Sequence, residues 1–293
     1  DWHASNATQY NVGIGNYVMN AVMDGALYNT AIGHNSLAGL TSGDNNVVIG
    51  KDAGDSIGSQ SECVLIGVDA GQLISHDDAN GSVAIGYLAM RYNTQGAANT
   101  AIGWKSMDLI DGVAADNNTA IGHSSMLSSG TSANSTASNN VAVGASSLTA
   151  ITTGNNNVAV GASSGLSLTD GHDNVSIGNS SLASPSSVGH VVAIGKGAMG
   201  NGVATIDGTV AIGSSALKAL TSGANNVAVG YSALLVNQTG GYNTAVGATA
   251  LDACTGGENT AVGWDAGGGT TTGIIDAVSS VAGITVVSVI SRL

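Results

Sequence analysis

The stretch that decides the fold runs from Asn243 to Leu251 and reads Asn-Thr-Ala-Val-Gly-Ala-Thr-Ala-Leu. Its first five residues follow a pattern that recurs along the chain: Asn, then Val or Thr, then Ala, then Ile or Val, then Gly. Fifteen glycines close successive copies, and their spacing is mostly 17 residues, with extremes of 16 and 22. A period of this length is typical of a solenoid, in which each repeat forms one coil.

The branched residues of the repeat predict a short strand. The residue before the closing glycine is Ile or Val in all fifteen copies, and the residue two positions earlier is Val or Thr in all fifteen. Side chains alternate along a strand, so these two share one face, and β-branched residues suit a packed, pleated surface. We predict that this face packs inside the coil, with a core that includes Ile32, Val47, Ile49, Ile102, Val143, Val160, Val229 and Val246.

The opposite face of the strand is small, because it carries Ala in eleven copies and then the closing glycine. A face without bulk lets another backbone approach closely, and a long apolar stripe usually marks an interface. We therefore predict that this face meets sister chains around the axis of a homotrimer. The residues predicted at this close-packed axis are Ala31, Gly33, Ala101, Gly103, Ala142, Gly144, Ala228, Gly230, Ala245 and Gly247.

The rest of each repeat predicts a second apolar anchor and a turn. The fourth residue after the closing glycine is Leu, Met or Gly, and a segment rich in Thr, Ser, Gly and Asn follows. We expect one coil to contain a strand, a turn, a second short strand and another turn. The leading Asn recurs in eleven copies and should form a ladder of amides from coil to coil.

These features predict an all-β protein: a parallel β-solenoid, or β-roll, of about fifteen coils over residues 1–267. Residues 268–293 leave the repeat and are predicted to be a C-terminal cap or trimerisation segment. Within that segment, Ile284-Thr285-Val286 suggests a strand, whereas apolar residues at helical spacing, such as Ile274 and Val278, suggest a short helix.

The charge of the chain excludes one class of partner. Only 9% of the residues are charged, and the formal net charge is -13 with six Lys and Arg residues. A nucleic-acid-binding protein needs clustered Lys and Arg to displace counterions, and no such cluster is present. The apolar stretch at 273–290 contains Asp276 and several Ser and Thr residues, so we predict no membrane insertion.

The repeated Asn-[Val/Thr]-Ala-[Ile/Val]-Gly unit, followed by Ser or Ala and then Leu, resembles the head repeats of trimeric autotransporter adhesins and the related repeats of bacteriophage tail fibres. The resemblance covers residues 10–267. It implies a parallel β-roll, three chains around a threefold axis, and attachment to a surface. The repeat here is longer than that of the adhesin heads, and no long heptad stalk follows, which favours the tail fibre or a related secreted or fragmentary fibre.

Two glycine motifs that can indicate enzymes fall in register with the repeat. Residues 161–165 match G-x-S-x-G and residues 195–200 match G-x-G-x-x-G, but both begin at a closing glycine and no βαβ unit follows. We therefore predict that the chain is not an enzyme and has no catalytic residues. Cys63 and Cys254 are about ten coils apart, which is too far for a disulfide bond within one chain, and we expect two free buried thiols.

Two acidic turns that contain histidine are candidate metal sites. His76-Asp77-Asp78 and Asp170-Gly171-His172-Asp173 contain oxygen and imidazole ligands. Asp and His are common in turns, and the calcium-binding nonapeptide of other β-rolls is absent. From the sequence we predict no metal and no cofactor.

The residue after the closing glycine is variable and should face solvent. In three successive repeats it is Tyr87, Trp104 and His123, and Arg91 and Tyr92 follow nearby. Stacked aromatic residues on a flat β face could bind sugar rings, or they could pack against turns or a neighbouring chain. The longest insert includes residues 127–136 and should protrude as a loop, either for recognition or as plain surface.

The sequence therefore favours a structural attachment protein on a cell or virion surface. Our leading hypothesis is a homotrimeric segment of a phage tail fibre that binds a cell-surface glycan or protein receptor. The alternative is a bacterial trimeric adhesin head or an extracellular matrix filament. An ice-binding solenoid is less favoured, because only five copies place Thr at the first strand position and we expect that row to be core.

Overall fold

The computed structural model describes residues 8–76, 79–110, 115–128, 135–202 and 206–269, with three short strands beyond them at 276–277, 280–281 and 284–285. The chain divides into two units, Asp1–Asn155 and Asn156–Leu293. The part of the chain described here includes no helix that is long and apolar enough to cross a membrane.

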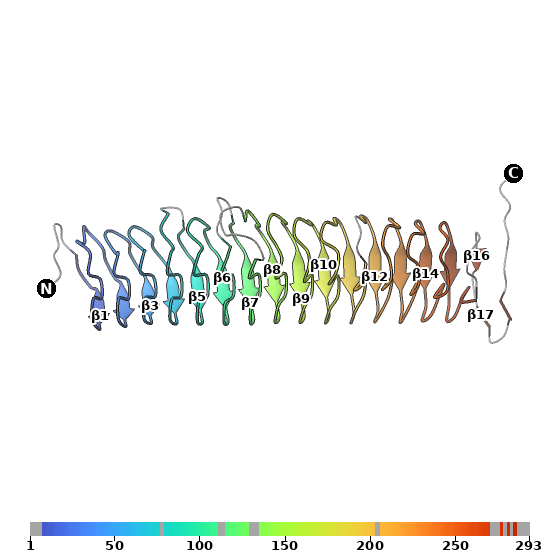
Figure 1. Ribbon diagram of the computed structural model, residues 1–293, viewed down its shortest axis with the longest axis horizontal. Helices are drawn as coiled ribbons and strands as arrows, with labels where there is room; N and C mark the ends of the chain where they lie inside the picture. The colour runs from blue at the N-terminus through green and yellow to red at the C-terminus, as the bar shows by residue number, and fades with distance from the viewer. Residues whose placement is uncertain are drawn as a thin grey trace. The chain divides into compact units, whose positions relative to one another are not determined.

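The first unit is a stack of eight three-residue parallel strands, drawn from blue to green in Figure 1. Successive strands pair in register, so that Val83, Ala84 and Ile85 lie opposite Thr100, Ala101 and Ile102 of the next coil. The strands are β1 (Val12–Ile14), β2 (Thr30–Ile32), β3 (Val47–Ile49), β4 (Val64–Ile66), β5 (Val83–Ile85), β6 (Thr100–Ile102), β7 (Thr119–Ile121) and β8 (Val141–Val143).

The second unit repeats this arrangement with seven strands of the same kind. They are β9 (Val158–Val160), β10 (Val175–Ile177), β11 (Val192–Ile194), β12 (Val210–Ile212), β13 (Val227–Val229), β14 (Thr244–Val246) and β15 (Thr260–Val262). The parallel β-solenoid and its 17-residue repeat are thus confirmed.

Three two-residue strands follow the repeats. β16 (Asp276–Ala277) adds to β15 in parallel, and β17 (Ser280–Val281) pairs with β18 (Ile284–Thr285) in antiparallel fashion. The strand alternative is therefore correct for Ile284 and Thr285. That this segment caps or trimerises the chain stays a prediction.

The predicted asparagine ladder is present in both units. The amide of Asn46 donates to Oδ1 of Asn29 at 2.9 Å, and the amide of Asn174 donates to Oδ1 of Asn157 at 2.9 Å. Each of these oxygens also accepts the backbone N–H of the same neighbouring Asn. The ladder residues from Asn29 onward are buried, so each of these hydrogen bonds satisfies polar groups that would otherwise be costly to desolvate.

The ladder is interrupted where the sequence departs from Asn. Cys63 occupies one ladder position, and its backbone N–H still donates to Asn46 Oδ1 at 2.9 Å. Ser82 takes the next, and its Oγ is the one buried side-chain oxygen or nitrogen without a hydrogen-bond partner among the described residues. A serine is too short to bridge to the neighbouring coil, which explains this exception.

The structure reverses the predicted orientation of the strands. The middle residue of every strand from β2 to β15 is buried within its own chain, and Ala31, Ala101, Ala142, Ala228 and Ala245 are all fully covered. The flanking residues predicted as coil core are instead half-buried or exposed: Ile32, Val47, Ile49, Ile102, Val143, Val160, Val229 and Val246. The prediction of Ala toward sister chains and branched residues inside the coil is therefore wrong.

The reason for this reversal is that the coil interior is filled from the opposite wall. The Leu and Met anchors four residues after the closing glycine are buried, as predicted, and include Leu37, Met107 and Leu217. A third row, which the sequence reading missed, lies three residues further on and includes Leu40, Ile110 and Leu220. With two large rows on one wall, only a small residue fits on the strand.

The wall opposite the strand is built from turns, so the predicted second strand is wrong. No strand is found between the closing glycine and the next Asn in the described residues, apart from isolated bridges such as His172–Gly189. The anchors hold positive φ angles, for example 55° at Leu37 and 52° at Met107. Hydrogen bonds between coils, such as Leu37 N–H to Ala53 O at 3.0 Å, fix this conformation.

The closing glycines are close-packed, but against the next coil of the same chain. At Gly33 (φ 141°) an added Cβ would lie 2.3 Å from the carbonyl oxygen of Gly50, and at Gly230 (φ 145°) it would lie 2.2 Å from that of Gly247. The close approach predicted for Gly33, Gly103 and Gly230 is therefore real, and its partner is the adjacent glycine of the stack rather than a sister chain.

Candidate functional site

The first candidate surface is the outer face of the strands, which we define as the first and third residues of β1–β15. None of these residues is fully buried, and Ile14, Val47 and Ile121 are among the exposed ones in the first unit. In the second unit the exposed ones include Ile177 and Val262. Every residue of this face is Val, Ile or Thr, and no residue of β1–β15 is charged. Each unit thus presents an uncharged stripe of branched side chains.

The second candidate surface is the aromatic row that the sequence predicted in the first unit. Tyr87 and Trp104 stack with ring centroids 6.4 Å apart, and Trp104 and His123 stack at 4.5 Å with planes 12° apart. The Lys105 ammonium lies 4.7 Å from the centroid of the Trp104 ring. The three rings come together as predicted, but they cover one another's faces. A sugar ring, which packs on an aromatic face, therefore finds little of the Trp104 face free.

Arg91 and Tyr92, the two other residues predicted at this surface, contact each other, and Arg91 also pairs with Asp108. The Arg91 guanidinium forms a two-point ion pair with Asp108, with Nε–Oδ1 at 2.9 Å and Nη2–Oδ2 at 3.2 Å. It also lies over the Tyr92 ring, 4.3 Å from the centroid. Burial raises the pKa of the Asp108 carboxyl although Arg91 acts in the opposite direction. Arg91 is thus held by the chain itself.

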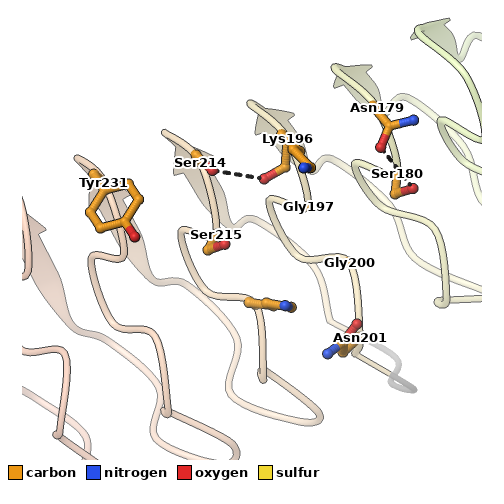
Figure 2. A pocket seen from close by; sticks show the side chains of 10 residues that line it. Asn179, Ser180, Lys196, Gly197, Gly200, Asn201, Ser214, Ser215 and Tyr231 are labelled. Carbon is orange, nitrogen blue, oxygen red and sulfur yellow. Dashed lines mark hydrogen bonds between the residues drawn. The ribbon is translucent and has the colours of Figure 1, made fainter.

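The third candidate surface is a shallow hollow of about 360 Å³ in the second unit, shown in Figure 2. Its lining comes from the turns that follow β10 to β13, and includes Asn179, Lys196, Asn201, Lys218 and Tyr231. The sequence reading did not identify it, although it assigned residues 195–200 to a repeat turn. The hollow forms where glycine replaces larger turn residues: an added Cβ at Gly197 would meet no atom within 4 Å.

The hollow brings two lysines of the second unit together. Lys196 and Lys218 are the only Lys or Arg between 156 and 269 in the sequence, and both line it. No ion pair between either lysine and an acidic residue is found in the described part of the chain. The phenol ring of Tyr231 is 63% exposed beside them. Two ammonium groups, amides, hydroxyls and an exposed ring suit an acidic, hydroxyl-rich ligand.

The remaining sequence candidates lie in ordinary repeat positions. Ser163, at the centre of the G-x-S-x-G match, has φ 55° and is equivalent to Ser146 and Ser180 in neighbouring repeats, at 55° and 54°. Residues 77–78 and 129–134, which belong to the predicted acidic turn and to the insert, lie outside the described residues.

Both cysteines are free and buried, as predicted. Burial raises the pKa of the Cys63 thiol and of the Cys254 thiol. A thiol with a raised pKa is largely protonated at neutral pH, and the protonated form is a poor nucleophile. Cys254 stands in the third interior row, so its position is explained by packing.

Comparison of the chain with family models, curated proteins and solved structures found no match.

Proposed function

We propose that the chain is a structural attachment protein: a homotrimeric segment of an extracellular or virion-surface fibre, of which a phage tail fibre is our leading example. The observation that carries this proposal is the uncharged outer face of the strands. Its copies join along this face, and not along the Ala and Gly rows that the sequence suggested, because those rows are inside the coil.

The outer face has the properties of a surface that another chain covers. A long contiguous apolar stripe is unusual on the surface of a monomeric protein. If each of the sixteen outer residues of β1–β8 gained about 0.5 kcal/mol on being covered, the sum would be about 8 kcal/mol, which is comparable to the cost of association. A copy of the same chain is the natural partner, because its strands have the same spacing.

The proposal predicts a trimer that charges on the outer face disrupt. Wild-type protein should have a native mass of three times 28.4 kDa. Ile49→Lys combined with Ile85→Lys should give monomers with an unchanged circular dichroism spectrum, because both side chains are only half-buried within one chain. Native mass spectrometry and light scattering provide the measurement.

Gln238→Lys combined with Thr239→Lys is the matched control for this experiment, since the pair adds the same two charges at exposed turn residues off the strands. It should remain trimeric. A wild-type protein that stays monomeric at micromolar concentration would contradict the proposal.

A second candidate function gains one observation from the structure. The sequence disfavoured ice binding because the Val and Thr row was expected to be core, but this row faces outward with the even spacing of stacked strands. Such a row could order water if no chain covers it. A monomeric wild type with thermal hysteresis would favour ice binding over the fibre, and a trimer without hysteresis would exclude it.

We further propose that the hollow lined by Lys196 and Lys218 (the lysine hollow) is the receptor site for attachment, and that it binds an acidic glycan of the cell surface. Lys196→Ala and Lys218→Ala should each weaken binding on an array of carboxylated and sulfated glycans by about tenfold or more, since one charge-assisted hydrogen bond contributes about 1.5–3 kcal/mol. Lys51→Ala is the control, because Lys51 already pairs with Asp52 in the other unit.

The same assay tests the aromatic row through Trp104→Ala. Loss of binding in this variant, with binding retained in both lysine variants, would place the receptor site at the aromatic row. Unchanged binding in all three variants would remove both surfaces from consideration.

A further inference from the structure

Three metal-ligating side chains converge in the second unit, on the turns that precede β10 and β11. Nδ1 of His172 lies 3.0 Å from Oδ2 of Asp173, and Nε2 of His190 lies 3.8 Å from the same oxygen. One ligand atom from each residue lies within 4.8 Å of the other two. The two imidazole rings meet edge to face with centroids 5.3 Å apart. All three side chains are exposed to solvent.

The backbone beneath these side chains is fixed by the stacking of coils. The N–H of His172 donates to Val188 O at 3.1 Å, and the N–H of His190 donates to His172 O at 3.2 Å. Gly189 N–H donates to the Asp207 carboxylate at 2.8 Å. Asp173 and His190 both have φ 57° and occupy equivalent repeat positions. The ligands are therefore presented by a rigid scaffold.

Because Gly189 has no side chain, there is space beside it for the imidazole ring of His172. An added Cβ at Gly189 would lie 2.8 Å from Cε1 of His172 and 3.2 Å from its Nε2. Gly189 stands directly opposite His172 in the stack, paired with it by an isolated bridge. The missing side chain thus lets the His172 imidazole lie over the next coil, toward the turn that carries His190.

We propose that His172, Asp173 and His190 bind one divalent transition metal ion, with Zn²⁺, Ni²⁺ and Co²⁺ as the fitting class. Zinc binds imidazole nitrogen and carboxylate oxygen at about 2.0–2.2 Å, so tetrahedral ligand atoms are roughly 3.4 Å apart. The distances of 3.0 Å and 3.8 Å from the two imidazole nitrogens to Asp173 Oδ2 fall on either side of this value. Two imidazoles and one carboxylate leave further coordination positions for water.

The ion would link two adjacent coils, because two ligands come from one coil and the third from the next. The sequence predicts no metal here because Asp and His are common in turns, and that prediction does not bring in the third ligand, His190, which lies 17 residues after Asp173. Among the described residues, this is the one group of three His, Cys, Asp or Glu side chains with such spacing. His34 and Asp52, 3.9 Å apart, form a histidine–carboxylate pair without a third ligand.

The test is a titration of tag-free protein with Zn²⁺ in a buffer without chelators, followed by isothermal calorimetry. We expect one equivalent per chain at micromolar affinity and a rise in the thermal unfolding midpoint, since a ligand that binds the folded state stabilises it. His172→Ala, His190→Ala and Asp173→Asn should each weaken binding by about tenfold or more. Circular dichroism confirms that the variants fold, which their exposed positions favour.

His34→Ala is the matched control and should leave the stoichiometry and the affinity unchanged. The proposal is overturned if wild-type protein takes up no Zn²⁺ at micromolar concentration. It is equally overturned if the His172→Ala and His190→Ala variants bind as tightly as the wild type, because the ion would then lie elsewhere.

Discussion

Gly103→Ala is expected to destabilise the protein by at least about 3 kcal/mol, although it adds one methyl group. An added Cβ at this position would lie 2.5 Å from the carbonyl oxygen of Gly122 and 2.7 Å from its carbonyl carbon. Both are backbone atoms of the next coil, so no side chain can rotate away. Relief requires the two coils to separate, which breaks their shared strand hydrogen bonds.

The conformation of Gly103 adds to the effect. Its φ of 134° lies in a region that residues with a Cβ rarely adopt. Thermal and urea unfolding, followed by circular dichroism, measure the loss. The variant should unfold at much lower urea concentration, and it should lose order first in the coils of β6 and β7, as hydrogen exchange would show.

Gly81→Ala separates the two causes. Gly81 also has a positive φ, 66°, but an added Cβ there would meet no atom within 4 Å. Equivalent positions in other coils hold residues such as Asn45 and Glu62 at similar angles. This variant should cost about 1 kcal/mol or less. Equal losses in the two variants would contradict the collision between coils.

The sequence predicts the repeat, the strands and the ladder because each follows from a residue type that recurs at a fixed place in the period. Asn46 bonds to Asn29, one period away, and a period is visible without a structure. The anchors Leu37 and Met107 are equally visible. The alternation of side chains along a strand does not show which face is inside the coil. Ala101 and Ile102 lie on opposite faces whichever way the strand is turned.

The choice between the two faces depends on the volume of the opposite wall. The interior there holds both Leu37 and Leu40, so Ala31 is the residue that fits against them. The buried row that includes Leu40 could have been predicted from the sequence, because aliphatic residues recur three positions after the anchors. Two other features that the sequence did not predict depend on the arrangement of neighbouring coils. His190 lies beside Asp173 of the preceding coil. The lysine hollow forms where Gly197 has no side chain.

A strong energetic coupling is expected in the fourth coil, where the large residue lies on the strand and glycine lies at the anchor position. Leu65 takes the strand position that holds Ala in eleven coils, and Gly71 takes the anchor position that holds Leu or Met in eleven coils. An added Cβ at Gly71 would lie 2.7 Å from Cδ2 of Leu65 and 2.9 Å from Cδ1 of Ile74. The large strand residue thus fills the space that the anchor fills in other coils.

Each single substitution should therefore destabilise the protein. Leu65→Ala leaves a cavity beside Gly71 and should cost about 2–5 kcal/mol. Gly71→Leu collides with Leu65 and should cost about 1–3 kcal/mol through overpacking. The backbone does not forbid leucine at position 71, because φ there is 58° and the buried anchor Leu37 holds 55°.

The double variant should recover most of the loss and unfold within about 1 kcal/mol of the wild type, a coupling of about 2 kcal/mol or more. It recreates the combination already present in the eighth coil, where Ala142, Leu148 and Ile151 are all fully buried. Urea unfolding of the four proteins measures the cycle. Leu65→Ala combined with Gly25→Ala, whose added methyl group meets no atom within 4 Å, should instead be additive. Additive losses for the Leu65 and Gly71 pair would mean that the two positions do not share one space, and that something other than volume places alanine inside the coil.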